Sequence, residues 1–365
     1  MLRARAEHTE SLRRLPPETV DDFFAAQFNR ICQPTRFGGY GMDIDVALEV
    51  IVRLARGCGS SGWVGGLMAL HNWQVSMFPL AAQQEYWADS PDVFCSSGAA
   101  SMGSKLTKVS GGYRLSGTWK FSSGADFGTW FLVMKPSKEC FDWMLVPRSD
   151  YAIVDDWHVS GLCGTGSKDI VLNDVFIPEH RRVSFESLLR GSTPGGRLYD
   201  GPFYKVPFFL AASWGLSASM IGMLDGIIDG FEQTLVGRRT LITGESQVER
   251  VANQMRLAES AVQSHSAKLL MRHSIEQLRE WGRTQVPSDD AEIQLPRRDL
   301  SYVAKITVEA ANRLFIAAGS SSIYHSNSIQ RLTRDINAAG THAGTAWDEA
   351  AEFYGRARWY LMPKH

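Results

Sequence analysis

The chain has 365 residues, of which 44% are hydrophobic and 21% are charged, with a formal net charge of -1. This length exceeds the usual size of one hydrophobic core, so two or three subdomains are expected. The near-neutral charge argues against nucleic acid as a partner and favours a small-molecule ligand. Because the first residues lack the apolar core of a signal peptide and no run of about 18 uncharged apolar residues occurs, we expect no membrane span and a cytoplasmic protein.

Residues 1–90 have the pattern of a helical domain, with apolar side chains three and four positions apart before the run Gly57–Gly62. That run matches Gly-x-Gly-x-x-Gly, the phosphate-binding pattern of dinucleotide-binding folds, which needs a preceding strand. The helical spacing before it predicts a helix-ending turn instead. His71 follows on an apolar helical stretch, where a core histidine and a pocket histidine are both open interpretations.

Residues 91–195 change to the alternating pattern of β-strands. Lys105–Val109 and Tyr113–Leu115 flank a Gly-Gly pair, which predicts a hairpin. Further strand-like runs indicate a compact β-barrel or folded sheet, and they lie at residues 130–134, 143–146 and 170–172.

Residues 196–365 return to helical spacing. Small residues recur every four positions and would let another helix approach closely, while Asp225 and Asp229 among them argue against a membrane span. The small residues are Ala218, Gly222, Gly226 and Gly230. Helical patterns at 247–281 and 297–319 complete an α+β chain that ends in a helical bundle.

The run Ser116–Gly124 is a candidate ligand-binding strand. It predicts Trp119 and Phe121 on one face, followed by Ser122, Ser123 and a glycine that allows close backbone approach. A planar ligand could rest there. A plain strand that ends in a serine turn is the alternative.

The segment from Gly161 to Ser167 contains two glycines around Thr165. Such a sequence forms a tight turn with exposed amides, which suits a phosphate, the edge of a ring or a simple hairpin. The histidines lack His-x-x-x-His spacing and the five cysteines are widely spread, so neither a metal site nor a disulfide framework is predicted.

The segment Arg334–Thr345 resembles the part of acyl-CoA dehydrogenases in which an Arg-Asp pair is followed, eight residues after the Asp, by a catalytic glutamate. Here that position holds Ala343, with His342 beside it. A methyl group cannot act as a general base, whereas an imidazole titrates near neutral pH and can. The resemblance therefore implies the same frame with different chemistry.

Together with the serine strand and the glycine turn, this segment resembles the oxygenase components of two-component flavin-dependent monooxygenases of the acyl-CoA dehydrogenase superfamily. The resemblance implies an N-terminal helical domain (1–90), a central β-barrel (91–195) and a C-terminal four-helix bundle (196–365), assembled as a homotetramer. It implies reduced flavin (FADH2 or FMNH2) supplied by a separate NAD(P)H-dependent flavin reductase. With O2, through a C4a-hydroperoxyflavin, such enzymes hydroxylate a small aromatic substrate of the phenol or indole type.

The resemblance also implies roles for particular residues. Ser123 would hold the flavin N5 edge, and His342 would deprotonate the substrate or support the hydroperoxide. His71 would lie in the pocket. The flavin would be bound by Ser96, Ser97, Trp119, Ser122, Ser123, Thr165 and Ser167.

The main alternative is an acyl-CoA dehydrogenase-type FAD oxidoreductase, or a related nitroalkane oxidase, whose base comes from elsewhere; Ala343 weighs against it. A non-catalytic flavin-binding protein is a third hypothesis. Arg238 and Arg239 partly resemble the arginine that meets the FAD pyrophosphate across a subunit boundary, so FAD and FMN both stay open. Indole, a substituted phenol, a polycyclic aromatic and an amino sugar all remain possible substrates.

Overall fold

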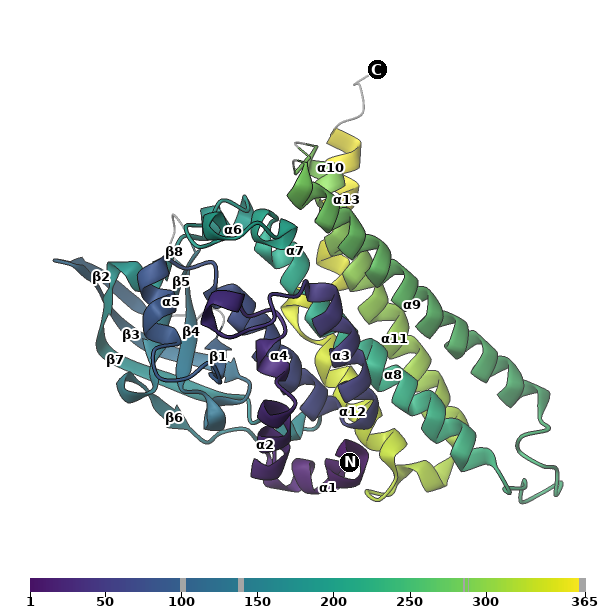
Figure 1. Cartoon of the computed structure of the whole chain (residues 1–365). Coiled ribbons are helices and arrows are strands. Elements are labelled where there is room, and N and C mark those ends of the chain that lie inside the picture. The colour runs from purple at the N-terminus through teal and green to yellow at the C-terminus, as the bar shows by residue number, and fades with distance from the viewer. Residues whose placement is uncertain (99–102, 137–140, 285, 288, 361–365) are drawn as a thin grey trace.

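The computed structural model describes residues 1–98, 103–136, 141–284, 286–287 and 289–360. The N-terminal helices lie between a β-region and the long C-terminal helices: in Figure 1 the strands are on the left, the N-terminal helices in the centre and the long C-terminal helices on the right. The four cysteines within the described residues are buried and free; Cys140 lies outside them.

The N-terminal helices are α1 (Leu2–Leu12), α2 (Pro17–Ala25), α3 (Ile44–Gly57), α4 (Gly59–Val75) and α5 (Leu80–Tyr86). Cys58 alone separates α3 from α4, so the glycine-rich run forms a helix-ending turn, as predicted, and no strand precedes it. Every residue of α4 except Leu67 is buried. Because α4 is enclosed on all sides, its side chains are held in fixed positions. These include Trp63 and His71, which contact the β-region.

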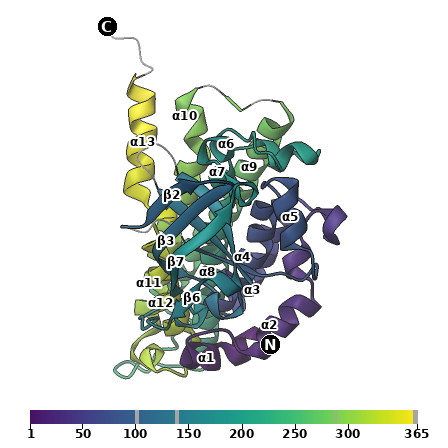
Figure 2. The same ribbon diagram turned by 90° about the vertical axis from the view of Figure 1, so that its left-hand side faces the viewer.

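Two four-stranded sheets form the β-region (Figure 2). One has the order β1 (Cys95–Gly98), β4 (Trp130–Pro136), β5 (Phe141–Pro147) and β8 (Arg182–Val183), with β1 parallel to β4. The other has the order β2 (Lys105–Val109), β3 (Gly112–Ser122), β7 (Lys168–Pro178) and β6 (Ala152–Val154). The predicted hairpin is confirmed as the antiparallel pair β2–β3.

The end of β3 corrects one expectation. Trp119 is fully buried in the core of the β-region, but Phe121 is 68% exposed and does not share its face. The pairing of β3 with β7 shifts register between Trp119 and Ser122, and Phe121 has a φ of 63°. Such a bulge breaks the two-residue alternation of a strand. As a result both Ser122 and Ser123 are buried although they are neighbours.

The remaining helices are α6 (Phe185–Leu189), α7 (Phe208–Ala212), α8 (Trp214–Leu235), α9 (Val251–Arg283), α10 (Asp290–Ile293), α11 (Leu295–Ala318), α12 (Ser328–Gly340) and α13 (Trp347–Tyr360). The small-residue stripe of α8 lies against α3. A Cβ atom on Gly222 would come within 2.2 Å of the Val52 carbonyl oxygen, and one on Gly226 within 2.5 Å of that of Arg56. The stripe therefore permits close helix packing, as predicted.

The segment Phe208–Leu235 is long and apolar enough, with a mean hydropathy of 1.3, to pass a membrane-span test based on length and composition. In the fold, 67% of that apolar window is buried among other helices. This is the pattern of a core helix.

Candidate functional site

Three buried hydroxyl groups form a chain of hydrogen bonds between the end of β3 and the start of β7. The Oγ atoms of Ser123 and Ser167 are 2.7 Å apart, and Oγ of Ser167 is 2.6 Å from Oγ1 of Thr165. Thr165 Oγ1 donates to the carbonyl oxygen of Leu162 at 2.8 Å. At the other end, the indole N–H of Trp63 on α4 donates to Ser123 Oγ at 3.2 Å. The serine strand and the glycine turn therefore meet at one place.

Local backbone geometry brings these groups together. Leu162 and Gly166 are both left-handed, with φ of 54° and 56°, so the chain turns sharply on each side of Thr165. Gly124, with a φ of 71°, donates its N–H to the Thr165 carbonyl at 2.8 Å. The bulge at the end of β3 turns Ser123 into the same space. None of these conformations follows from alternation along a strand.

His342 lies beside the hydroxyl chain. Its ring and the ring of Trp63 meet edge to face, with centroids 5.9 Å apart. The backbone N–H of Gly344 donates to His342 Nδ1 at 2.9 Å, so in the neutral imidazole the proton is on Nε2. The side chain reaches solvent, although protein atoms surround it on most sides. This desolvation lowers the pKa of His342.

His71 has the opposite tautomer. It is buried on α4, and its Nδ1 lies 2.5 Å from the carbonyl oxygen of Cys95 in β1. A carbonyl can only accept, so Nδ1 carries the proton and Nε2 is the unprotonated nitrogen. Burial lowers the pKa of His71 to about 4, which keeps the ring neutral at physiological pH.

The other residues assigned from the sequence are placed differently. Ser122 Oγ is buried and has no hydrogen-bond partner among the described residues. Ser96 and Ser97 are adjacent in β1, so they point to opposite faces; Ser96 is fully buried, whereas Ser97 is half-buried and shares the face of Cys95. Trp119 lies in the core of the β-region with its indole N–H bonded to a backbone carbonyl, apart from the hydroxyl chain.

Asp335 joins the turn to the helix that leads to His342. Its Oδ1 accepts the backbone N–H of Leu162 at 2.6 Å, and its Oδ2 lies against Gly59, the first residue of α4. Burial raises the pKa of Asp335 to about 6. Beside it, Arg331 and Arg334 on α12 form ion pairs with Glu10 of α1. These contacts hold α1, α4, α12 and the turn in one arrangement.

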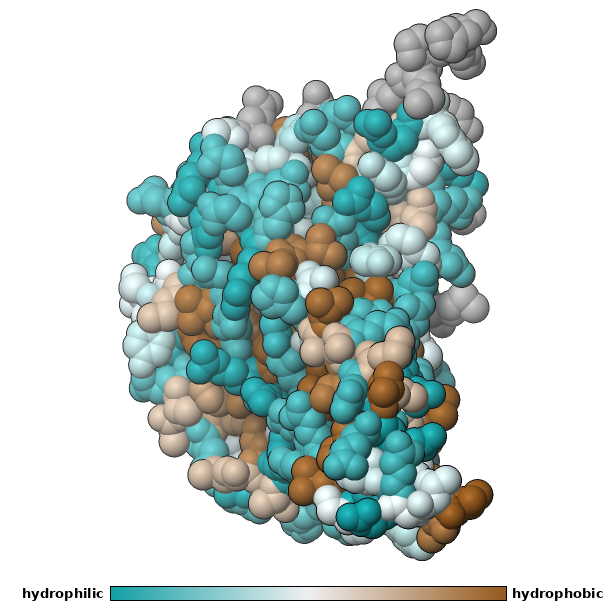
Figure 3. All heavy atoms as spheres, turned by 90° about the vertical axis from the view of Figure 1, so that its right-hand side faces the viewer, coloured by the Kyte–Doolittle hydropathy of each residue, from teal (hydrophilic) through white to brown (hydrophobic). Residues whose placement is uncertain are grey.

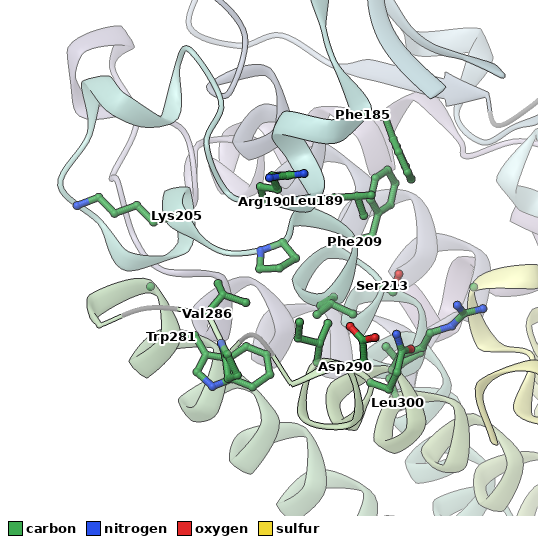
Figure 4. Close-up of a pocket in the computed structure, with 18 of the residues that line it drawn as sticks. Phe185, Leu189, Arg190, Lys205, Phe209, Ser213, Trp281, Val286, Asp290 and Leu300 are labelled. Carbon is green, nitrogen blue, oxygen red and sulfur yellow. The ribbon is translucent and has the colours of Figure 1, made fainter. Parts of the chain in front are cut away.

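A cavity of about 1390 Å³ opens next to the His342 segment, with Gly344 in its wall (Figure 4). Figure 4 shows Phe185, Leu189 and Phe209 on one side and Trp281, Val286 and Leu300 on the other. Charged side chains also line it, namely Arg190, Lys205, Arg283, Asp290 and Arg297. The cavity can hold an organic ring, and Gly344 of its wall bonds the His342 imidazole, although His342, Trp63 and Ser123 do not themselves line the cavity.

Comparison with known proteins shows the family to which the chain belongs. Residues 214–347 match the family described as "Acyl-CoA dehydrogenase, C-terminal domain". The chain is 33% identical, over its whole length and 92% of the relative, to the oxygenase component of FADH(2)-dependent resorcinol hydroxylase from Rhizobium sp. (strain MTP-10005). The chain belongs to the flavin-dependent monooxygenase oxygenase components. It therefore has the acyl-CoA dehydrogenase-like fold, and as an enzyme of this family it uses reduced flavin and O2.

Solved structures agree over the full chain. The 3-HSA hydroxylase from Rhodococcus sp. RHA1 superimposes with a TM-score of 0.92 and 30% identity, covering 100% of this chain and 95% of that one. XiaF from Streptomyces sp., solved in complex with FADH2 and glycerol, gives a TM-score of 0.88 and 25% identity, covering 100% and 93%. The prediction of this family from three short segments is confirmed.

The residues of the monooxygenase fit a flavin. The ring edge of a flavin presents N–H and carbonyl groups, and the site offers uncharged hydroxyls and an imidazole. The Oγ of Ser122, next to Ser123 in the chain, is buried without a hydrogen-bond partner among the described residues. Trp63 and Asp335 were not assigned to the site from the sequence. Trp63 lies two helical turns before His71 on the same helix, a spacing that could have linked them. Asp335 belongs to the Arg-Asp pair on which the family resemblance rests, but its contact with Leu162, 173 residues away, could not be deduced from the sequence.

Proposed function

We propose that this monooxygenase hydroxylates a small aromatic substrate of the phenol or indole type at the site built around Ser123 and His342. The observation that carries the proposal is the contact series from the cavity wall at Gly344, through His342 and Trp63, to Ser123. It connects space for a substrate with hydroxyl groups suited to a flavin edge. Reduced flavin, when bound, supplies the electrons that activate O2.

In this proposal Ser123 accepts a hydrogen bond from flavin N5, while Ser122, Ser97, Thr165 and Ser167 contribute polar contacts around the flavin. The roles of Ser96 and Trp119 toward flavin stay predictions; both are fully buried within the β-region. Because Thr165 and Ser167 are also hydrogen-bonded to each other, their first effect is to hold Ser123 in place.

The tautomers of the two histidines suit them to different roles, His342 as a hydrogen-bond donor and His71 as an acceptor. His342 presents Nε2–H, so it donates a hydrogen bond to an oxygen atom of the reacting groups. The second role expected from the sequence, removal of a substrate proton, requires Nδ1 to exchange its bond with Gly344. His71, whose Nε2 is unprotonated, is the alternative acceptor.

The substrate class rests on the cavity and on the relatives. Each of the two opposite walls of the cavity carries both aromatic and aliphatic side chains, and planar rings pack well between such groups. Relatives are named as a resorcinol hydroxylase, a p-hydroxyphenylacetate 3-hydroxylase from Acinetobacter baumannii and an indole-3-acetate monooxygenase from Pseudomonas putida. We propose a phenol first and an indole second.

The proposal includes a separate NAD(P)H-dependent flavin reductase as partner, a cytoplasmic location, and neither nucleic acid nor membrane as a ligand. It also includes the finer architecture expected from the sequence. The two sheets would close as a barrel in a domain of residues 91–195, beside an N-terminal helical domain of residues 1–90. In the domain of residues 196–365, α8, α9, α11 and α12 would form the four-helix bundle.

A homotetramer is part of the same proposal. Figure 3 shows the face on which α9 lies, where hydrophobic side chains are found among polar ones. On α9 the exposed apolar residues recur along one side, and in the preceding loop two are almost fully exposed. They are Val251, Met255, Val262 and Leu269 on α9, with Leu241 and Ile242 in the loop. Burial against other subunits would remove this apolar surface from water.

The test is product formation from phenols and indoles with chemically reduced FAD or FMN and 18O2. We expect a hydroxylated product that carries one labelled oxygen atom and that is absent when the protein is omitted. Reduction of bound FAD by an acyl-CoA, with no labelled product from any phenol or indole, would instead establish the dehydrogenase alternative.

A further inference from the structure

Lys168, the first residue of β7, is buried beside the hydroxyl chain although the site described above does not use it. It follows Ser167 directly and is only 7% exposed. Its Nζ lies 2.8 Å from Oδ1 of Asp126, whose side chain is 13% exposed, and 3.2 Å from Oδ2 of Asp155. A buried ion pair adds little net stability compared with apolar residues of similar size, because both charges lose their hydration. The stability of the fold therefore does not explain why a lysine is buried here.

The ion pair joins the two segments that carry the hydroxyl chain. Asp126 lies just after the end of β3, and Lys168 is the residue of β7 that pairs with Ser122 at that end. The turn before Lys168 also touches the carboxylate, because a Cβ atom on Gly166 would come within 3.0 Å of Asp126 Oδ2. The Lys168–Asp126 pair thus ties the end of β3 to the turn that holds Thr165.

The end of β3 has a conformation that its own sequence does not favour. Phe121 has a φ of 63°, which is costly for a bulky residue that is not glycine, and such strain persists only where the surroundings hold it. Regular alternation would place Phe121 on the buried face of Trp119 and would turn Ser122 to the other face. The shift in register that prevents this lies between Trp119 and Ser122, directly before the residue that pairs with Lys168.

We infer that the Lys168–Asp126 ion pair holds the strained bulge at Phe121, and that Lys168 is thereby a positioning residue for Ser122 and Ser123. The inference rests on the proposed function, which gives these two serines contacts with flavin. Without the pair, the end of β3 can relax toward regular alternation, and Ser122 then leaves its buried place. Fixing one register among alternatives is the best-attested use of a buried polar or ionic group.

The experiment replaces both charges of the pair in the whole protein, as Lys168→Met with Asp126→Leu. We expect the double variant to be about as stable as wild type in denaturant titration, because apolar residues of similar size replace the pair. Its affinity for reduced FAD or FMN, measured without oxygen, should fall about tenfold or more, as expected when one or two hydrogen bonds to the ligand are lost. The share of reduced flavin that ends as hydrogen peroxide should rise.

A rescue and a matched control separate positioning from general support of the fold. Glycine adopts a positive φ without steric strain, so Phe121→Gly in the double variant should restore most of the lost affinity. Lys120 and Asp169 form another lysine–aspartate pair across the same two strands, with Nζ and Oδ2 3.9 Å apart, but the Lys120 side chain is 68% exposed. An exposed pair contributes little, so Lys120→Met should leave the affinity unchanged.

Two results would overturn the inference alone: a double variant that binds reduced flavin as wild type does, or weakened binding that Phe121→Gly does not restore. The second result would mean that the pair supports the fold without setting the bulge. If the double variant does not fold, Asp126→Asn removes one charge at constant size, and the same loss and rescue are expected to a smaller extent. Failure of the wild-type protein to bind reduced flavin would overturn the proposed function as well.

Discussion

Helix α4 and the segment after α12 each bring a histidine toward the β-region, but they treat the imidazole differently. His71 is enclosed within a helix whose side chains are nearly all buried, and a backbone carbonyl of β1 fixes its tautomer. His342 follows the end of α12, two residues before a residue of the cavity wall, and it makes a local hydrogen bond to Gly344 and an edge-to-face contact with Trp63. The environment of His71 favours a rigid side chain in the wall of the site. The environment of His342 favours a side chain that exchanges protons.

The two histidines are the same residue type, so their different burial accounts for their different expected roles. Changing the protonation of His71 requires the charged form to be desolvated, which the lowered pKa of about 4 expresses. His342 is reached by solvent and can reorient by breaking one hydrogen bond. Loss of His71 should therefore affect the fold first, and loss of His342 the reaction first.

The largest expected effect is on product formation and comes from replacing His342, the histidine that solvent reaches. His342→Ala is expected to lower hydroxylated product about 100-fold or more, the usual range for a lost proton-transfer group. Unfolding free energy and flavin affinity should change little, because the side chain is accessible. Product yield per reduced flavin and hydrogen peroxide release measure the effect. Unchanged hydroxylation would reject the role of His342.

For the buried histidine, His71→Ala is expected to lower the free energy of unfolding by about 2–4 kcal/mol, because it leaves a cavity and an unpaired Cys95 carbonyl. His71→Asn is the matched control, since its amide can still donate to that carbonyl, and it should recover part of the loss. Denaturant titration gives both values. A His71→Ala protein that is as stable as wild type but inactive would show that His71 acts in the reaction and not mainly in the fold.

The smallest expected effect is on stability and concerns Asp335, which contacts both the turn at Leu162 and the first residue of α4. Its pKa is raised to about 6 in the folded state and returns to its ordinary value of 3.8 on unfolding. The folded state thus holds the proton more tightly, so ionisation of this group favours unfolding as pH rises from about 4 to about 6. Asp335→Asn keeps an acceptor for the Leu162 N–H without the buried charge.

We therefore expect Asp335→Asn to gain stability relative to wild type as pH rises, by about 1–3 kcal/mol between pH 4 and pH 7. The difference between the two proteins in denaturant titrations at each pH isolates this group from other carboxylates. A constant difference across that range would show that Asp335 ionises freely in the folded state.

Sequence patterns predicted the helices, the hairpin and the family well, because these depend on residues near each other in the chain. The small residues of α8 and the end of α3 at Gly57 are examples. The prediction for Phe121 was wrong: strand alternation predicted one face for Trp119 and Phe121, but a bulge turns Phe121 away from that face. A bulge depends on the partner strand β7, which periodicity within β3 does not contain.

By itself, the sequence determined the order of helical and β-rich regions, the loss of the glutamate at Ala343 and the presence of a serine strand, a glycine turn and a histidine. Only the tertiary structure decided that Trp63 bonds Ser123, that Asp335 holds the turn at Leu162, and which nitrogen of each histidine carries the proton. The physical reason is that a hydrogen bond takes its direction from its partners, and the partners of these groups are far away in the chain.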